Sequence, residues 1–409
     1  MHTIGTGKNK LPRSMNFKNL FWWSFLLFVF TIPISQFISV RLLVILLLVS
    51  FFVKSRGDSF FSFIKNSWDI ILYLSTLAIG LIYSEELSTG LNVIETNFSF
   101  LAIPVVISRC PAVDRIKLNE IFRAFKLGLL AASLVCLCFA IYHYNQKPDI
   151  QFFFFYKFTD AIHSHPTYFA YYIILVISVE LFNLFYERRG LEATFNYVTI
   201  LFLFLLLILT GGQTAFIGIL FVFSFFILKF LIEEKTTEKK ITVGFVILML
   251  CCLFLISLAE KQFLLIEFND SWERAVLWES ALSAIPNVFL GVGTGDYRTA
   301  LNDYYTSHGL LQFATESYNS HNQAIQILFS NGILGLLSFG FMIIRPLFLA
   351  IQNKNILTTL CFFPFLVYGM TEAFLGRYQG VVFFALLHQV FVSTMLTEKS
   401  FSTDLLTEK

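Results

Sequence analysis

Long apolar runs, separated by short polar connectors, occupy most of this chain. A helix needs about 20 predominantly apolar residues to cross a bilayer, and about twelve runs come near that length. They lie at positions 18–35, 37–53, 67–84, 91–108, 121–143, 166–186, 195–211, 213–232, 241–259, 322–344, 355–373 and 378–396. The pattern predicts an all-α, polytopic membrane protein with about twelve transmembrane helices, in which residues 1–409 form a single integral membrane domain.

The amino-acid composition agrees with this prediction and excludes several other classes of protein. The chain is 56% hydrophobic and 14% charged, a balance that excludes an ordinary soluble globular protein. A net charge of +2 gives no indication of nucleic-acid binding. The six cysteines lie in or beside predicted spans and include no C-x-x-C pair. We therefore interpret them as packing residues and expect no disulfide and no metal site.

The distribution of positive charge predicts the orientation in the membrane. Cytoplasmic connectors of membrane proteins are enriched in lysine and arginine. If the N-terminus is cytoplasmic, roughly three quarters of the 29 lysines and arginines fall on the cytoplasmic side. We therefore expect both termini to be cytoplasmic and the long loop at 260–321, between the ninth and tenth spans, to face outward.

The outward loop begins with a predicted amphipathic helix that runs from Asp270 to about Ile285. Arg274 lies in its first turn, where a cation is slightly unfavourable beside the positive end of the helix dipole. Stabilisation of this helix therefore does not explain why an arginine stands at position 274. A guanidinium group is well suited to binding a diphosphate through paired N–H donors.

The sequence G-V-G-T-G-D-Y at 291–297 contains Gly291, Gly293 and Gly295. Its spacing is not that of a dinucleotide-binding loop, and no strand precedes it. We interpret it as a close-approach turn beside a ligand. Arg298, directly after it, is either a second anion contact or a surface charge.

His321 stands in S-H-N-Q, where the loop re-enters the membrane. The ordinary pKa of histidine suits a general base at neutral pH, although a residue that only anchors the interface explains the position too. Asn322 and its polar neighbours offer orienting hydrogen bonds. The last outward turn brings Glu372 and Arg377 to the same face.

Two other outward connectors contain polar sequences. H-S-H-P-T-Y at 163–168 includes His165 and Tyr168 and opens the sixth span. We expect these residues to anchor the interface or to line the mouth of the site; a metal site lacks carboxylate partners. T-G-G-Q-T at 210–214, with Gln213, is either an anion-binding turn or a plain tight turn.

Three spaced motifs in this region resemble the O-antigen ligase and polymerase superfamily of bacterial envelope glycan enzymes. They are R-x-x-x-W (Arg274 and Trp278), P-x-x-x-x-G-x-G-x-G (286–295) and an H-N pair followed by G-x-x-G (321–335). H-P-T-Y at the sixth span and T-E-A-F-L-x-R-x-Q-G at 371–380 are similar to outer features of the same proteins.

The resemblance implies a glycosyl transfer without metal or cofactor at the periplasmic face of the bacterial inner membrane. The donor would be a glycan on undecaprenyl diphosphate, and the acceptor a hydroxyl of lipid A core, another glycan or a protein. His321 would be the general base, and Arg274 would hold the leaving diphosphate. The expected substrate-binding residues are Arg298, Arg377, Glu372, Gly291, Gly293, Gly295, His165, Tyr168, Asn322 and Gln213.

One position departs from the family. Its members commonly have a Ser-Arg pair where this chain has Gly212 and Gln213. A second arginine for the diphosphate is therefore missing there. Either Arg377 or Arg298 substitutes for it, or the contact with the donor differs.

Other functions remain open at this level. O-antigen ligases, O-antigen polymerases and protein O-oligosaccharyltransferases share these motifs. A transporter would show internal repeats and paired charges in the membrane, whereas the sequence has no evident repeat and one deep carboxylate, Glu180. A non-catalytic scaffold or receptor would not need Arg274 and His321 at a shared mouth.

Overall fold

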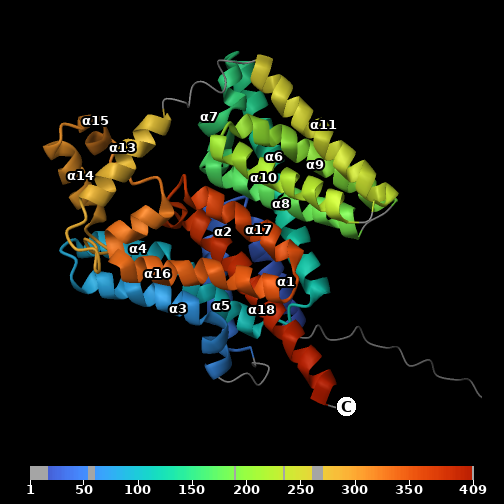
Figure 1. Cartoon of the computed structure of the whole chain (residues 1–409), viewed down its shortest axis with the longest axis horizontal. Coiled ribbons are helices and arrows are strands. Elements are labelled where there is room, and N and C mark those ends of the chain that lie inside the picture. The colour runs from blue at the N-terminus through green and yellow to red at the C-terminus, as the bar shows by residue number, and fades with distance from the viewer. Residues whose placement is uncertain (1–16, 54–59, 188–189, 234, 260–269, 408–409) are drawn as a thin grey trace, which may run out of the picture.

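The computed structural model describes residues 17–53, 60–187, 190–233, 235–259 and 270–407, which form helices and no strand (Figure 1). The helices are α1 (Phe17–Thr31), α2 (Gln36–Ser50), α3 (Phe60–Ile82), α4 (Leu87–Thr96), α5 (Ser99–Arg109), α6 (Arg115–Gln146), α7 (Phe155–Thr159), α8 (Pro166–Tyr186), α9 (Leu191–Thr210), α10 (Gln213–Ile232), α11 (Thr237–Ala259), α13 (Asp270–Ser283), α14 (Tyr297–Ser307), α15 (Leu311–Thr315), α16 (Gln323–Gln352), α17 (Ile356–Gly369) and α18 (Tyr378–Thr407). Three short 3₁₀ turns join them: η1 (Ile150–Phe153), η2 (Asp160–Ile162) and η3 (Phe374–Gly376).

Each predicted span falls on helical residues, so the prediction of an all-helical, polytopic membrane protein is confirmed. Among the described residues, 7 helical segments are long and apolar enough to cross a membrane, and α1, α2 and α17 are shorter apolar helices. The span predicted at 91–108 is divided into α4 and α5. Asn97 between them leaves the helical conformation, and its side-chain amide donates to the carbonyl oxygen of Val93.

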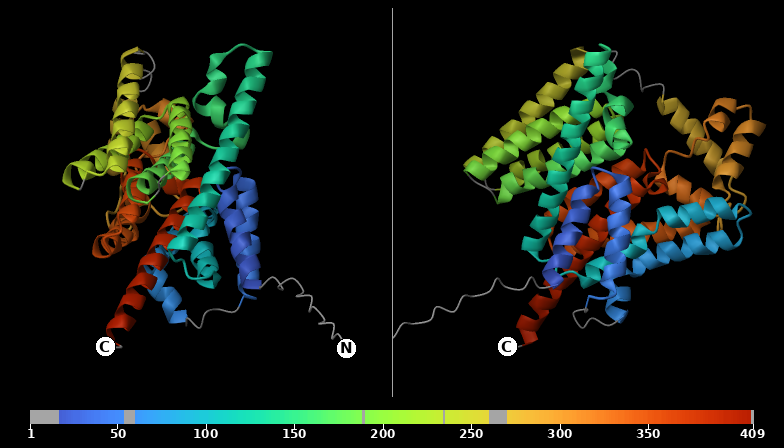
Figure 2. Two further views of the ribbon diagram at one scale, coloured as in Figure 1. Left: turned by 90° about the vertical axis from the view of Figure 1, so that its right-hand side faces the viewer. Right: turned by 180° about the vertical axis from the view of Figure 1, so that it is seen from behind.

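Helices α8 to α11 group on one side of the molecule, and α3, α4 and α13 to α16 on the other, with α18 between them (Figures 1 and 2). Nearly all side chains of α8 and of the first part of α18 are buried. A helix that is apolar all round is typical of such a central position. Phe383 of α18 packs against Phe125 of α6 and Tyr172 of α8, with ring centroids 5.2 and 4.6 Å apart.

The described part of the outward loop folds onto the end of α16. Helices α13, α14 and α15 enclose a small hydrophobic core of their own. Its buried members are Leu277, Ala281, Leu301, Tyr305, Phe313 and, from α16, Phe329. The predicted amphipathic helix is confirmed as α13, which ends at Ser283. The loop is therefore a packed layer that holds residues above the membrane-spanning helices.

A break in α16 receives the glycine-rich turn of this loop. Gly332 has φ 62° and ψ −163°, a conformation that essentially only glycine adopts. The break frees backbone groups, which bond to the loop instead. The amides of Val292 and Gly293 donate to the carbonyls of Phe329 and Ser330, and the amide of Ile333 donates to Val288.

We expect Gly332→Ala to destabilise the protein by about 2 kcal/mol or more, because the positive φ is strained for alanine. The added methyl carbon would also lie 2.2 Å from the carbonyl oxygen of Phe289. Gly340→Ala is the matched control, since no atom lies within 4 Å of its methyl position on the same helix. Thermal unfolding in detergent measures both. Equal melting temperatures for the two variants would show that the docked turn contributes no stability.

Candidate active site

Connectors predicted on the outward side meet at one end of the helix bundle. The carboxylate of Asp296 accepts from the backbone amides of Glu85 (3.0 Å) and Glu86 (2.8 Å), which ties the loop to the end of α3. Two neighbouring cavities lie at this end. Their linings draw on 36, 73–97, 150–167, 211–214, 273–331 and 371–379, segments that are far apart in the sequence.

The first cavity, which we name the apolar cavity, has a volume of about 630 Å³. Ile150, Phe154 and Leu277 contribute apolar surface to it. Arg274 is the one lysine or arginine among the described residues that line it. His165, His321 and Glu372 also face this cavity.

The second cavity, which we name the polar cavity, has a volume of about 640 Å³. Its lining includes the side-chain amides of Asn97, Asn319, Gln323, Gln326 and Gln379. Arg298 and Arg377 line it too. Tyr318 and Glu372 line both cavities, so they form part of the wall between them.

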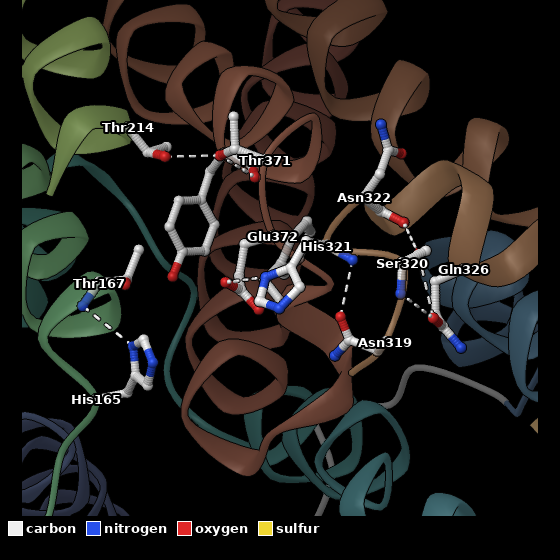
Figure 3. Close-up of polar contacts among 12 residues, drawn as sticks. His165, Thr167, Thr214, Asn319, Ser320, His321, Asn322, Gln326, Thr371 and Glu372 are labelled. Atoms are coloured by element: carbon white, nitrogen blue, oxygen red, sulfur yellow. Dashed lines mark hydrogen bonds and ion pairs between the residues drawn. The ribbon is translucent and has the colours of Figure 1, made fainter. Parts of the chain in front are cut away.

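His321 lies between α15 and α16, at the boundary of the apolar cavity (Figure 3). Its backbone has φ 44°, in the left-handed region that non-glycine residues rarely adopt. The side-chain oxygen of Asn319 accepts from its backbone amide at 2.8 Å. The ring Nδ1 lies 3.4 Å from Oε2 of Glu372. Strain of this kind often marks a functional site, where the surroundings hold a residue in place.

Glu372 follows α17, and its carboxyl group is largely buried. Burial alone raises the pKa of this carboxyl. The hydrogen bond and charge of His321 outweigh burial, with help from His165 and Arg377, and the pKa of Glu372 lies below its ordinary value. Glu372 is therefore a carboxylate at neutral pH. It can orient the His321 ring and stabilise the ring after it takes up a proton.

Hydrogen bonds at the start of α16 fix the segments that carry His321 and Glu372. The side-chain oxygen of Asn322 accepts from the amides of Ala324 and Ile325, which caps the helix, and its amide donates to the carbonyl of Met370. Gln323 accepts from the amide of Leu375 at 2.7 Å. Both residues thus hold His321 and the turn of Glu372 together.

Comparison with known protein families gives one match, which includes part of this region. Residues 198–340 match the sequence model of a family described as O-antigen ligase. This region is similar to that family. The resemblance seen in the motifs is confirmed, although no curated protein matches the chain.

The matched region contains Arg274 and His321, whereas Glu372 and Arg377 follow it in the sequence. His165 precedes it. The site that the structure assembles is therefore wider than the matched domain.

Several predicted substrate-binding residues lie outside both cavity linings. Gly291 packs against the backbone of α16, Gly293 against Ser84 and Gly295 against the carbonyl of Glu86, with no room for a methyl group. The structure thus places the three glycines at a docking contact. Of the motif at 291–297, Thr294 and Tyr297 line the polar cavity.

Three further predicted residues have other positions. Tyr168 is buried, and its hydroxyl donates to the carbonyl of Phe374, which supports the turn that carries Glu372. Asn322 acts as the helix cap described above. The side chain of Gln213 lies outside the described residues, whereas its neighbour Gly212 lines the apolar cavity.

Sequence reasoning missed two features of this site. It placed Glu372 near substrate and did not pair it with His321. It also passed over Tyr318, whose ring lies 5.6 Å from the His321 ring between centroids. Glu372 stands in the T-E-A-F-L motif, and this motif was the signal in the sequence that could have indicated its role. Tyr318 stands three residues before His321 and belongs to no motif that would have indicated it.

Proposed function

We propose that this protein is an O-antigen ligase that transfers a glycan from undecaprenyl diphosphate to an acceptor hydroxyl on lipid A core. The His321–Glu372 contact in a cavity that also contains Arg274 carries the proposal. A base with an orienting carboxylate and a cation for the leaving group are what such a transfer requires.

In this proposal the donor lies in the apolar cavity. The apolar lining accommodates the first part of the polyprenyl chain, and Arg274 forms paired hydrogen bonds with the diphosphate. No lysine could reproduce the planar fork of two parallel N–H donors. Because Arg274 and His321 line the same cavity, a donor held at its diphosphate by Arg274 presents its anomeric carbon toward His321.

The acceptor glycan occupies the polar cavity, and its hydroxyl reaches the shared wall at Glu372. Side-chain amides both donate and accept, which suits the hydroxyl groups of a sugar. His321 takes the acceptor proton while the acceptor oxygen bonds to the anomeric carbon. The bond from that carbon to the diphosphate breaks, and its electron pair leaves with undecaprenyl diphosphate.

The surrounding assignments follow from the same reaction. The protein lies in the bacterial inner membrane with both termini cytoplasmic and both cavities on the periplasmic side, where lipid-linked glycans are joined to their acceptors. The reaction uses no metal and no cofactor, because His321 and Arg274 supply the base and the charge.

Two relatives of this activity use the same chemistry. A polymerase would lose only the long glycan ladder when inactivated, with single units still attached to lipid A. A protein O-oligosaccharyltransferase would lose protein glycosylation alone. Loss of all attachment to lipid A core supports the ligase, and unchanged glycans with impaired transport would support a transporter.

Transfer in proteoliposomes tests the proposal directly. Purified protein is supplied with a glycan on undecaprenyl diphosphate and with rough lipopolysaccharide, and the product is followed on a gel. Transfer to lipid A core without added metal, in the presence of a chelator, supports the ligase. The same assay is repeated with a glycan and with a protein as acceptor. Folded wild-type protein that transfers to none of these three acceptors would reject the proposal.

Arg274→Ala is expected to raise KM for the donor by about ten- to a hundredfold, the loss typical of hydrogen bonds to a charged group. Arg274→Lys should recover part of this loss, since it keeps the charge without the paired geometry. Initial rates at varied donor concentration measure both. Lys147→Ala, an exposed cation outside both cavity linings, is the control. An unchanged donor KM in Arg274→Ala would remove Arg274 from the donor site.

A further inference from the structure

A hydrogen-bonded pair, Tyr156 and His165, lies in the apolar cavity together with Arg274. The Tyr156 oxygen is 2.7 Å from Nε2 of His165, and the two rings are perpendicular. Tyr156 belongs to α7 and His165 precedes α8, whereas Arg274 belongs to α13. The pair and the arginine therefore reach the cavity from different elements.

The other ring nitrogen of His165 defines the direction of this hydrogen bond. Nδ1 accepts from the backbone amide of Thr167 at 3.3 Å, in the cap of α8 (Figure 3). A neutral ring with Nδ1 as acceptor carries its proton on Nε2. His165 then donates to the phenol oxygen, and the phenol proton of Tyr156 is directed to an acceptor other than His165.

The ring of His165 is neutral at neutral pH. Burial lowers the pKa of His165, Glu372 opposes this in part, and Arg377 and His321 add to the lowering, so that the pKa lies at about 4. The tautomer inferred from the cap is therefore the form present under ordinary conditions.

The backbone beside the pair is strained. Phe155 has φ 53° and His163 has φ 48°, both in the left-handed region. Phe155 directly precedes Tyr156, and its ring lies beside Gly211 on the same cavity. Such conformations cost free energy and persist where the surroundings hold them, often at ligand sites. The segment is thus held in the shape that turns Tyr156 toward the cavity.

We propose that Tyr156, oriented by His165, donates a hydrogen bond to the diphosphate of the donor lipid. The inference rests on the proposed function, because it assigns a residue to the leaving group of that reaction. A diphosphate carries at least two negative charges, while Arg274 is the one lysine or arginine in the described lining. A phenol aimed at the departing oxygen stabilises the charge that develops when the glycosyl bond breaks. The phenol keeps its proton throughout.

Binding of two lipids to the purified protein in nanodiscs separates recognition of the diphosphate by Tyr156 from a general contribution to lipid binding. Undecaprenyl diphosphate and undecaprenyl monophosphate share the chain and differ in one phosphate. Tyr156→Phe is expected to weaken binding of the diphosphate about tenfold or more. Binding of the monophosphate should change little. Tyr142→Phe, an exposed tyrosine of α6 outside both cavity linings, should match the wild type.

His165→Asn tests the orienting role, because asparagine keeps the cap of α8 and removes the Nε2 donor. It should weaken diphosphate binding as Tyr156→Phe does, and the double variant should lose no more than either single variant. Equal losses for both lipids would show that the pair only lines the chain-binding wall, and wild-type affinities would remove it from the site. Wild-type protein that binds neither lipid would instead reject the proposed function.

Discussion

Replacing His321 with alanine is expected to lower glycan transfer by about 10² to 10⁴-fold, the range typical of a lost general base. Without the imidazole, no group at this position can take the acceptor proton as the new glycosidic bond forms. The donor KM should change little, since Arg274 still holds the diphosphate. Single-turnover rates in proteoliposomes measure this effect separately from donor binding.

Two further variants sharpen the experiment. Glu372→Gln should lower the rate less than His321→Ala, because the base remains and only its orientation and charge stabilisation are weakened. His308→Ala, an exposed histidine at the end of α14, should transfer at the wild-type rate. Normal transfer by a folded His321→Ala protein would show that His321 only anchors the interface.

The second large effect is expected in a buried charged cluster whose residues lie outside both cavity linings. Asp69 of α3 accepts from Arg345 of α16 at 2.5 Å and lies 2.8 Å from Nε2 of His388 on α18. Asp69 and His388 are fully buried. Arg345 also donates to the carbonyls of Lys65 and Asn66, beside the break in α3 at Ser67.

Asp69→Ala should destabilise the protein by about 3–5 kcal/mol, because it leaves a buried guanidinium without its counter-charge. The cluster joins α3, α16 and α18, and α16 begins two residues after His321. Thermal unfolding in detergent measures the loss, with Asp303→Ala, an exposed carboxylate of α14, as the control. A melting temperature equal to that of the wild type would mean that water or lipid phosphate replaces the carboxylate.

The charged cluster also shows a limit of the sequence argument. Glu180 is the one deep carboxylate that the sequence suggested, and it pairs with Lys126 at 2.8 Å. Asp69 stands near the start of its span, where a carboxylate commonly reaches water. Its burial depends on α16 and α18, which follow far along the chain.

The sequence by itself determined the helices and the residue types of the site. Transfer of a side chain from water to lipid is a property of that residue and its neighbours, so runs of apolar residues predict spans without reference to the rest of the fold. Arg274 and His321 were recognisable because their motifs lie within one outward region. The matched O-antigen ligase domain covers both of them.

Only the tertiary structure decided which residues meet. The pairing of Glu372 with His321, the division into an apolar and a polar cavity and the contact between Tyr156 and His165 each join different connectors. The glycines of the loop depend on distant segments too, because they pack against the backbone of α16, Ser84 and Glu86. Such contacts follow from how helices pack against one another, which depends on the shapes of distant surfaces and not on local hydropathy.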